Sequence, residues 1–514
     1  MKNIIRIIAM ICALIMLAGC FIGCANTAEP AETTEPAKTE ISGGSEETSA
    51  NANLDDNGFL KDDLPEGLNF NETVSILYWS DCERAEFDIT EYEADTDIVK
   101  DAIYRRNLTA QARLGVTFEW TGTPGNTNKR KDFVNFVNNC YSGGTYYDII
   151  AAYSRTAGML LTEGFIQDFN TIEDSYINTS QPWWPKSMLE TCSIKDSLFY
   201  VSGDISTNIL HFMYAIYYNM DMLKKLHLDD PVQFVDDKTW TIDKLIEMSK
   251  GLYSDLDQDG TKSVDDQYGF VSEDYHLDAF YTGSGLRLLV PDEDSYLKIS
   301  DDFFGQKTTD LVDKLGQWFK AGDTAVQSNN WKPFRYREPF DNGNCLFRLD
   351  RVYAADYEFN NGSLRNADFE YGILPVPLYD ENQEDYITVV GNPYTLWCIM
   401  QNAKNPSMST AVIECLASEG YRKTSPALFE SNMKYRYTPD NAGKGDGARM
   451  FDIIRATIAF DQGRTFGDIT NLMSEMPSNA AADSISWSSV QAKYKTSLKR
   501  SIADLNKALG QVID

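Results

Sequence analysis

The stretch from residue 74 to residue 163 alternates short apolar runs with segments of helical periodicity. In chain order, the runs and segments are 74–79, 97–114, 116–120, 131–140, 146–151 and 156–163. Strands that alternate with helices at this spacing predict a parallel sheet with right-handed crossovers. In such sheets ligands bind beyond the carboxyl ends of the strands. The chain is therefore expected to be an α/β protein whose ligand contacts follow Trp79, Thr121 and Tyr153.

A second α/β pattern begins near residue 209. The apolar run 211–218 ends at Asn219 and leads into a helix over 220–226. Later strands are expected at 344–347, 369–375 and 388–400. Helical sequence dominates from Ser407 onward. At roughly 150 residues per domain, a chain of 514 residues has room for two such units and a tail.

The N-terminus has the pattern of an export signal. Lys2 and Arg6 precede an apolar run, and Leu17-Ala18-Gly19-Cys20 resembles the bacterial lipobox, in which the cysteine is acylated. Residues 1–19 are therefore expected to be a lipoprotein signal peptide, and Cys20 the lipidated residue. Cys24 is a second candidate, and a plain signal peptide or an uncleaved anchor is the alternative.

Residues 20–68 are expected to form a lipidated, disordered tether. Thr, Glu, Ala, Ser and Pro dominate it, and almost no large apolar side chain occurs before Leu54. Such a segment cannot bury enough surface to offset the entropy of ordering it. No other stretch approaches 18 consecutive apolar residues, so the body is expected on the extracellular face of the membrane, held by the lipid alone.

Charge and motifs exclude several classes of function. The chain has 46 Lys and Arg against 77 Asp and Glu, a formal net charge of −31, which disfavours nucleic acid and anionic lipid as partners. There is no G-x-S-x-G, H-E-x-x-H or Walker motif. The cysteines after the leader have no CxxC spacing, which disfavours a zinc or redox centre. They are Cys82, Cys140, Cys192, Cys345, Cys398 and Cys415.

The order of short motifs along the body resembles the extracellular solute-binding proteins of bacterial ABC importers, in the large lipid-anchored family 1 that mostly carries sugars. Besides the lipobox, the matching pieces are YDII at 147–150, PWW at 182–184, LFYVSGD at 198–204, YYNMDMLKK at 217–225, TWTIDKL at 239–245, FDNG at 340–343 and YGILP at 371–375. One departure is Met220, where this family more usually has lysine. The resemblance covers essentially the whole mature body.

The resemblance implies a two-lobe periplasmic-binding-protein-like fold with hinge strands and a ligand cleft between the lobes. Lobe 1 would comprise 69–202 and 394–436, and lobe 2 would comprise 207–388, with the C-terminal helices of 437–514 mostly on lobe 2. Hinges are expected at Ser202-Gly203-Asp204 and Gly391-Asn392-Pro393, because a few residues can absorb the dihedral change of closure. The implied protein is a monomer whose partners are a carbohydrate and permease subunits.

An acidic loop at 255–266 has the spacing of a calcium-binding loop, with carboxylates at positions one, three, five and twelve and Gly260 at six. The expected ligands are Asp255, Asp257, Asp259, Thr261, Ser263 and Asp266. At position twelve Asp266 stands where an EF-hand has Glu, and its shorter arm predicts lower affinity. A structural calcium ion is expected here, and a solvated acidic turn is the alternative.

A sugar has polar edges and apolar CH faces, so its receptor needs aromatic platforms beside carboxylates and amides. The candidates near strand ends and crossings are Trp79, Asp81, Glu83, Tyr153, Trp183, Trp184, Asp204, Asp350, Arg351 and Asn392. Core packing is the alternative for each tryptophan. Pairing with a local acid is the alternative for Arg351.

The predicted function is capture of a carbohydrate, an oligosaccharide, for an ABC transporter, with no chemistry done on the ligand. One alternative is a binding protein for a non-sugar solute such as a peptide. Another is a secreted glycoside-active enzyme that uses two carboxylates. Among 77 acidic residues a suitable pair can always be found, so their presence gives no support to an enzyme.

Overall fold

The structure is a computed structural model that describes most of the chain from residue 53 onward. The described residues are 53–55, 57–89, 97–327, 335–355, 364, 367–429 and 445–513. The expected signal peptide, Cys20, Cys24 and the tether as far as residue 52 lie outside them. Among the described helices, none combines the length and the apolar character needed to cross a membrane.

The expected tether extends too far, because its last residues pack on the folded body. Leu64 is buried, and the buried Asp62 carboxylate contacts Arg113 at 2.9 Å. The same carboxylate accepts a hydrogen bond of 3.1 Å from the hydroxyl of Ser418. The acidic composition of this stretch therefore led to a tether that was predicted too long. Its last residues pack on lobe 1, where Asp62 is paired with Arg113.

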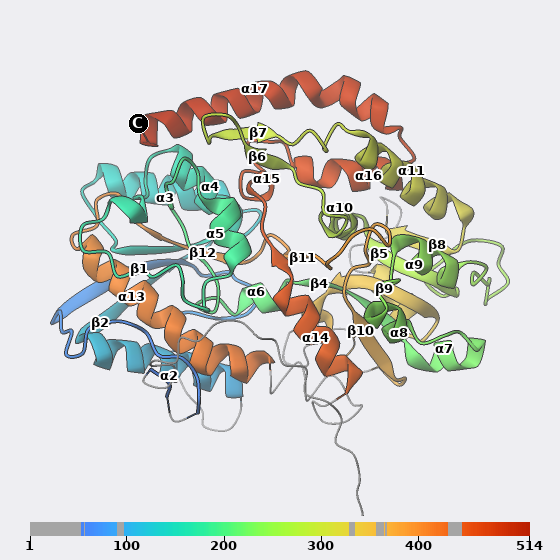
Figure 1. The fold of residues 1–514 in the computed structure, drawn as a ribbon, viewed down its shortest axis with the longest axis horizontal. Coiled ribbons are helices and arrows are strands. Elements are labelled where there is room, and N and C mark those ends of the chain that lie inside the picture. Colours follow the sequence, from blue (N-terminus) through green and yellow to red (C-terminus); the bar gives the residue numbers. More distant parts are fainter. Residues whose placement is uncertain are drawn as a thin grey trace, which may run out of the picture. The chain divides into compact units, whose positions relative to one another are not determined.

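The first lobe is built on a four-stranded sheet of order β12-β3-β1-β2 (Figure 1). Its strands are β1 (Glu72–Trp79), β2 (Val116–Thr123), β3 (Ile149–Tyr153) and β12 (Thr395–Ile399). The first three are parallel and β12 is antiparallel to β3. Its helices are α2 (Ile98–Leu114), α3 (Arg130–Ser142), α4 (Ser154–Thr162) and α13 (Pro406–Glu419). The alternation of strands and helices predicted for 74–163 is confirmed.

Local signals explain where α2 begins and ends. The carboxylate of Asp97 accepts hydrogen bonds from the amides of Val99 and Lys100, which satisfies donors that a helix N-terminus leaves free. Gly115 ends the helix with a φ of +60°, in the left-handed region that favours glycine. The chain can therefore turn directly from α2 into β2.

The second lobe is built on a five-stranded mixed sheet of order β10-β4-β9-β5-β8. The strands are β4 (Tyr214–Asn219), β5 (Tyr268–Glu273), β8 (Thr324–Gln327), β9 (Cys345–Arg351) and β10 (Tyr371–Leu374). Its helices include α7 (Met220–Leu226), α8 (Pro231–Asp236), α9 (Ile242–Ser249), α10 (Asp278–Gly283), α11 (Gln306–Ala321), α14 (Asp446–Ala456) and α16 (Met476–Ala482). Asn219 caps α7 through its side chain, as the strand-to-helix motif predicts.

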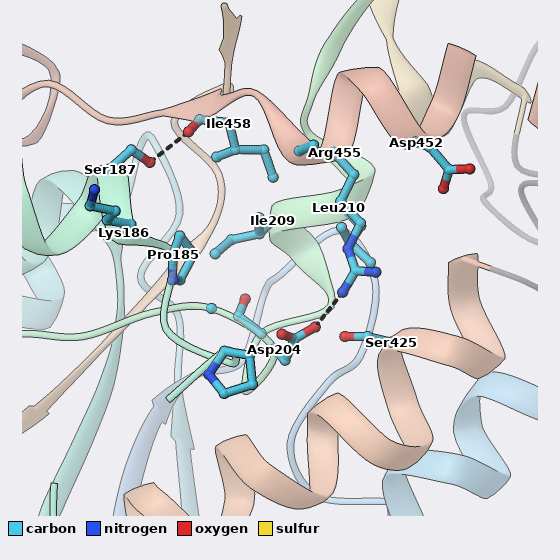
Figure 2. Close-up of a pocket in the computed structure, with 14 residues that line it drawn as sticks. Pro185, Lys186, Ser187, Asp204, Ile209, Leu210, Ser425, Asp452, Arg455 and Ile458 are labelled. Atoms are coloured by element: carbon cyan, nitrogen blue, oxygen red, sulfur yellow. Dashed lines mark hydrogen bonds and ion pairs between the residues drawn. The ribbon is translucent and has the colours of Figure 1, made fainter. Parts of the chain in front are cut away.

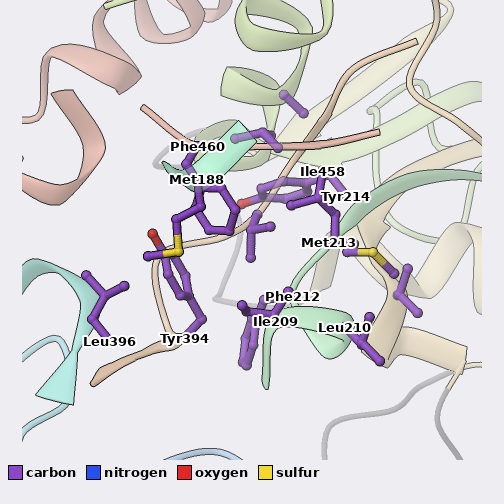
Figure 3. Close-up of a cluster of buried hydrophobic side chains, with 14 of the residues drawn as sticks. Met188, Ile209, Leu210, Phe212, Met213, Tyr214, Tyr394, Leu396, Ile458 and Phe460 are labelled. Atoms are coloured by element: carbon purple, nitrogen blue, oxygen red, sulfur yellow. The ribbon is translucent and has the colours of Figure 1, made fainter. Parts of the chain in front are cut away.

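Three chain segments lie together between the lobes. The first contains the short helix α6 (Asn208–His211), the second contains β11 (Thr388–Val389), and the third runs through β13 (Ile458–Ala459) into α15 (Gln462–Thr465). β11 and β13 pair in parallel. Figure 3 shows that apolar side chains from all three segments pack into one cluster, joined by Met188 from α5 (Lys186–Cys192). The cluster members labelled there include Phe212, Met213, Tyr214, Tyr394, Leu396, Ile458 and Phe460.

A buried carboxylate ties the segment after β1 to these crossings. Glu86 is fully buried and accepts hydrogen bonds from the hydroxyls of Ser206 and Thr207 and from the amide of Asn208, at 2.9–3.2 Å. Arg106 on α2 is also fully buried and donates to the backbone carbonyls of Ile205 and Glu86. The first crossing is therefore fixed to lobe 1 by polar groups that water does not reach.

The C-terminal helix contacts both lobes. Helix α17 (Trp487–Ile513) packs on α11 and on the hairpin strand β7 (Leu297–Ile299) of lobe 2, and also on α4 of lobe 1 (Figure 1). The indole of Trp487 donates to the carbonyl of Phe303 at 3.0 Å. The C-terminal helices α14 and α16 contact β10 and α11 of lobe 2, and α17 contacts lobe 1 in addition to lobe 2.

Candidate ligand-binding site

Charged residues meet where strands of both sheets end. Arg155 follows the end of β3 in lobe 1, and Asp274 follows the end of β5 in lobe 2. Glu475, from the segment before α16, lies within electrostatic range of both, and also of Asp278 and Arg464. Ligands of α/β sheets bind at the carboxyl ends of strands, so this group of charges marks the candidate site.

On the lobe 1 side, two arginines share one carboxylate. Arg130 reaches Asp468 through Nε and Nη2, both at 2.8 Å. Arg155 reaches the same two oxygens at 3.1 and 2.9 Å. The Arg130 guanidinium also lies 5.9 Å from the ring centroid of Tyr153. Bidentate pairing of this kind fixes the orientation of both guanidinium groups.

On the lobe 2 side, the buried pair of Arg464 and Asp278 leaves hydrogen-bonding positions open. Nη1 of Arg464 contacts Oδ2 of Asp278 at 2.5 Å. Nε of Arg464 and Oδ1 of Asp278 are both buried and have no hydrogen-bond partner among the described residues. A buried charged group with an unused donor or acceptor is costly, so each such position is a place where a ligand atom is favoured.

Glu475 is an acid of this group whose pKa is strongly raised. Burial, together with the neighbouring charges of Asp278 and Asp274, raises its pKa to about 7 against the opposing effect of Arg464 and Arg155. Burial also raises the pKa of Asp274. Acids with raised pKa values that lie among specific charge partners are typical of functional sites.

Lobe 1 and the second crossing contribute further open polar atoms. Oγ1 of Thr156, next to Arg155, is buried without a partner among the described residues, and so is Oδ1 of Asn392. The carbonyl of Asn392 accepts a hydrogen bond of 2.6 Å from the hydroxyl of Ser154. Asn392 therefore lies beside the start of α4, where the sequence predicted a ligand contact.

The structure corrects the expectation that tryptophans form exposed platforms. Trp79 and Trp183 are 0% exposed and Trp184 is 3% exposed. The Trp79 indole donates to Thr395 at 2.9 Å, and both other indoles donate to Glu414, at 3.0 and 3.1 Å. Each ring is therefore a core residue whose polar atom is already satisfied inside the protein.

Three other candidates also have internal roles. Tyr153 is 2% exposed and its hydroxyl accepts from Thr127. Asp81 accepts from the amides of Gly125 and Asn126 at 2.7 and 3.0 Å, so it orders the loop after β2. Asp350 is fully buried in a network with the residues Arg348, Arg337 and Tyr336. Against the opposing effect of burial, the guanidinium groups of Arg348 and Arg337 hold the pKa of Asp350 well below its usual range.

The remaining candidates lie at the boundary between the lobes. Glu83 is exposed and lies within electrostatic range of Tyr353 in lobe 2. Arg351, at the end of β9, is half-buried among aromatic rings. Asp204 pairs with Arg455 at 3.0 Å. These three positions, together with Asn392, remain predictions for contact with a ligand.

Asp204 lines a cavity of about 500 Å³ beside the crossings (Figure 2). Its walls come from the start of α5, the first crossing and α14. The hydroxyl of Ser187 donates to the carbonyl of Ile458 at 2.6 Å across it, and the pair of Asp204 and Arg455 forms a second link. None of the strand-end charges described above lines this cavity. We therefore place the candidate site at the strand ends and not in this cavity.

The acidic loop brings its first three carboxylates together. Oxygens of Asp255, Asp257 and Asp259 lie within 4.8 Å of one another. Asp266 is fully buried, and its two oxygens accept from the amides of Leu256 and Ser263 at 3.1 and 2.9 Å. The three clustered carboxylates suit a hard cation, whereas the twelfth-position carboxylate is already used to close the loop.

Several residues of the site were not among the sequence candidates. They are Arg130, Arg155, Thr156, Tyr214, Asp274, Tyr275, Asp278, Arg464, Asp468 and Glu475. Arg155 and Asp274 directly follow strands, so a rule that takes the two residues after each strand would have found them. Arg464 lies on α15, Asp468 in the turns that follow it and Glu475 in the short helical turn before α16, and no local signal marks them.

Residues 88–423 match the family described as bacterial extracellular solute-binding protein. This match covers more than half of the chain, so the protein belongs to that family, whose members are non-enzymatic binding components of importers. A comparison with curated protein sequences gives no significant match.

Solved structures show the same fold at low sequence identity. The galacto-N-biose/lacto-N-biose I-binding protein of the ABC transporter from Bifidobacterium longum has a TM-score of 0.53 at 12% identity, over 85% of this chain and 98% of that one. An extracellular solute-binding protein from Staphylococcus aureus in complex with maltose has 0.52 at 10% identity, over 86% and 99%. The cyclic α-maltosyl-1,6-maltose-binding protein from Arthrobacter globiformis has 0.51 at 11% identity, over 86% and 98%. The two-lobe α/β fold expected from the sequence is confirmed.

Proposed function

We propose that this protein captures an oligosaccharide outside the cell and presents it to the permease of an ABC importer. The observation that carries this proposal is the set of buried polar atoms without partners at the strand ends. Nε of Arg464 can donate, Oδ1 of Asp278 can accept, and Oγ1 of Thr156 can do either. A sugar hydroxyl both donates and accepts, so a row of hydroxyls matches a mixed set of this kind.

Aromatic rings beside these atoms support the same ligand class. The half-buried ring of Tyr275 lies near the Arg351 guanidinium, with its centroid at 5.7 Å, whereas the ring of Tyr214, with its centroid at 5.5 Å, is buried inside the protein. Tyrosine combines an apolar face with a hydroxyl, which suits the apolar and polar sides of a sugar ring. Two of the solved neighbours described above are named for the saccharides that they bind and the third is in complex with maltose, which favours a carbohydrate over a peptide for this chain too.

A thermal-shift screen of the soluble body, residues 53–514, over neutral and acidic oligosaccharides and short peptides tests the proposal. At least one oligosaccharide should raise the melting temperature, because a ligand that binds only the native state stabilises it by mass action. The hit should also change tryptophan fluorescence without release of reducing sugar. If a peptide and no saccharide gives the shift, the carbohydrate assignment is wrong and the non-sugar alternative is correct.

We further propose that Cys20 carries the lipid that holds the receptor at the membrane. Replacing Cys20 by alanine should leave the protein unacylated, because the lipobox resemblance rests on that thiol. Incorporation of a labelled fatty acid and recovery in the membrane fraction would measure this. Cys24→Ala is the matched control and should be acylated normally, whereas acylation of the Cys20 variant would transfer the assignment to Cys24.

The acidic loop supports a separate proposal, a structural calcium ion held by Asp255, Asp257 and Asp259. Calcium in hundredfold excess over its dissociation constant should stabilise the protein by about 2.7 kcal/mol, and a chelator should reverse the effect. The double variant Asp255→Ala, Asp259→Ala should lose this response. Glu293→Ala with Asp294→Ala, an exposed acidic pair elsewhere, is the control and should keep it. An equal calcium response in both double variants would dismiss the site.

A further inference from the structure

Arginines gather at the boundary between the lobes of a chain whose net charge is −31. Arg130 and Arg155 share the single carboxylate of Asp468. Arg464 is paired with Asp278. Arg351 forms no ion pair with any described carboxylate. Three of the four guanidinium groups are thus paired with a carboxylate, and that of Arg351 is not.

Arg351 is the least compensated of the four. Its Nε and Nη2 reach only the hydroxyl of Tyr214, at 3.4 and 3.3 Å. Its guanidinium carbon lies 5.2, 5.5 and 5.7 Å from the ring centroids of Phe212, Tyr214 and Tyr275. The rings stabilise the cation through their faces but do not neutralise its charge. The expected alternative, that Arg351 pairs with a local acid, is wrong for the described part of the chain.

The acids near Arg351 are committed elsewhere. Asp350 precedes it in sequence, but its carboxylate lies against Arg348 and Arg337. Asp278 is within electrostatic range of Arg351 and is bound to Arg464. Neither carboxylate forms an ion pair with the Arg351 guanidinium.

The position of Arg351 is fixed against the second crossing. A Cβ atom added to Gly391 would lie 2.7 Å from Nε of Arg351 and 3.2 Å from its Cζ. Arg351 lies at the end of β9. Its guanidinium is packed against the backbone of Gly391, in a segment that was expected to act as a hinge. A cation held in this place can contact a ligand that lies between the lobes.

We propose that the site takes an acidic oligosaccharide and that Arg351 recognises its anionic group, the carboxylate of a uronic acid or a sulfate ester. This inference rests on the proposed function and narrows its ligand class. A half-buried cation without a counter-ion is costly, and an incoming anion removes that cost. Guanidinium binds carboxylate and sulfate oxygens through two parallel N–H donors, which a neutral hydroxyl cannot match.

The test measures the preference for an acid over a neutral sugar of the same skeleton. Tetragalacturonate is compared with its methyl ester, a sulfated heparin tetrasaccharide with its desulfated form, and cellotetraose and maltotetraose serve as neutral probes. Affinities are measured by titration calorimetry on the wild-type body and on the variants Arg351→Gln and Arg351→Lys. Arg500→Gln removes the same charge from the exposed face of α17 and is the matched control.

One acidic probe should bind at least about tenfold more tightly than its neutral counterpart, and added salt should reduce the difference. Arg351→Gln should abolish the preference, Arg351→Lys should keep part of it, and Arg500→Gln should keep all of it. The melting temperature of Arg351→Gln should fall only slightly, because the change removes ring contacts and a long hydrogen bond to Tyr214 but no ion pair. The pair of probes that shows the preference identifies the anion as carboxylate or sulfate.

Two results would overturn the inference while leaving the receptor function intact. One is a neutral probe that binds as tightly as its acidic counterpart. The other is an acid preference that survives in Arg351→Gln. If no saccharide of either class binds, the proposed function itself fails.

Discussion

Replacing Glu86 by alanine should lower the free energy of unfolding by about 3–5 kcal/mol, which is the usual cost of leaving a buried charge without its nearby counter-charge. The change removes the acceptor for Ser206, Thr207 and Asn208 in the first crossing. It also leaves the guanidinium of Arg106 buried without the nearby carboxylate. Burial already lowers the pKa of Arg106 to about 10 against the opposing effect of Glu86, so this cation is sensitive to the loss.

Denaturant unfolding of wild type, Glu86→Ala, Arg106→Met and the double variant measures the effect. The double variant should be destabilised by less than the sum of the two single changes, because the second change removes the unpaired charge that the first one creates. Glu83→Ala, three residues away and exposed, is the control and should change stability by no more than about 0.5 kcal/mol. A loss below about 1 kcal/mol in Glu86→Ala would mean that the crossing is fixed by its apolar cluster alone.

Glu475→Gln should weaken binding of the oligosaccharide found in the screen by roughly ten- to 150-fold. A hydrogen bond to a charged group contributes about 1.5–3 kcal/mol, and 1.4 kcal/mol is a factor of ten. Glutamine keeps the shape of the side chain and removes only its charge. Titration calorimetry at pH 8 measures the affinity, and unchanged affinity would remove Glu475 from the site.

The same substitution should make the protein more stable at pH 8. The folded-state pKa of Glu475 is about 7, above the ordinary value of 4.5, so the folded state binds more protons between those two pH values. The free energy of unfolding therefore falls as pH rises through that window. Glu475→Gln removes the contribution of this carboxyl to the fall in the free energy of unfolding. That contribution should be about 1–3 kcal/mol after allowance for partial exposure. A smaller fall should remain, because burial also raises the pKa of Glu414 to about 7.

Weaker binding together with greater stability is the combination expected of a residue kept for function. Melting curves of wild type and Glu475→Gln at pH 5 and pH 8 measure the stability arm. The two proteins should differ at pH 8 and converge at pH 5. A variant that is less stable at both pH values would show that Glu475 has a structural role instead.

Much of the fold could be predicted from the sequence because its signals are local. Strand, helix and cap patterns over 74–163 depend on neighbours a few residues apart, and they match β1, α2, β2, α3 and β3 in order. The site could be predicted only in part, because its polar groups come from distant segments. Arg155 meets Asp468 and Asp278 meets Arg464 only after the chain has crossed between the lobes.

The tryptophans were predicted to contact the ligand but lie in the core, and the reason is again a set of partners far away in the sequence. Trp79 ends a strand, which is where a ligand contact is expected, yet its indole donates to Thr395 on β12. Trp183 and Trp184 are adjacent to each other and both donate to Glu414 on α13. Whether a large aromatic faces a ligand or the core depends on partners more than 200 residues away, and no local pattern carries that information. Trp79→Ala is therefore expected to reduce stability before it reduces affinity.

Helix α17 bears on how the receptor behaves before any solute arrives. A receptor that is closed in only a fraction of molecules has an apparent dissociation constant equal to the intrinsic one divided by that fraction. A rigid helix that packs on α4 of lobe 1 and on α11 of lobe 2 opposes wide separation of the two lobes. Separation would require the helix to slide along one of these two partners or to lose its contacts with it. We expect it thereby to raise the closed fraction in the empty protein. Part of the affinity of this receptor would thus come from a helix at the C-terminus that contributes no residue to the candidate site.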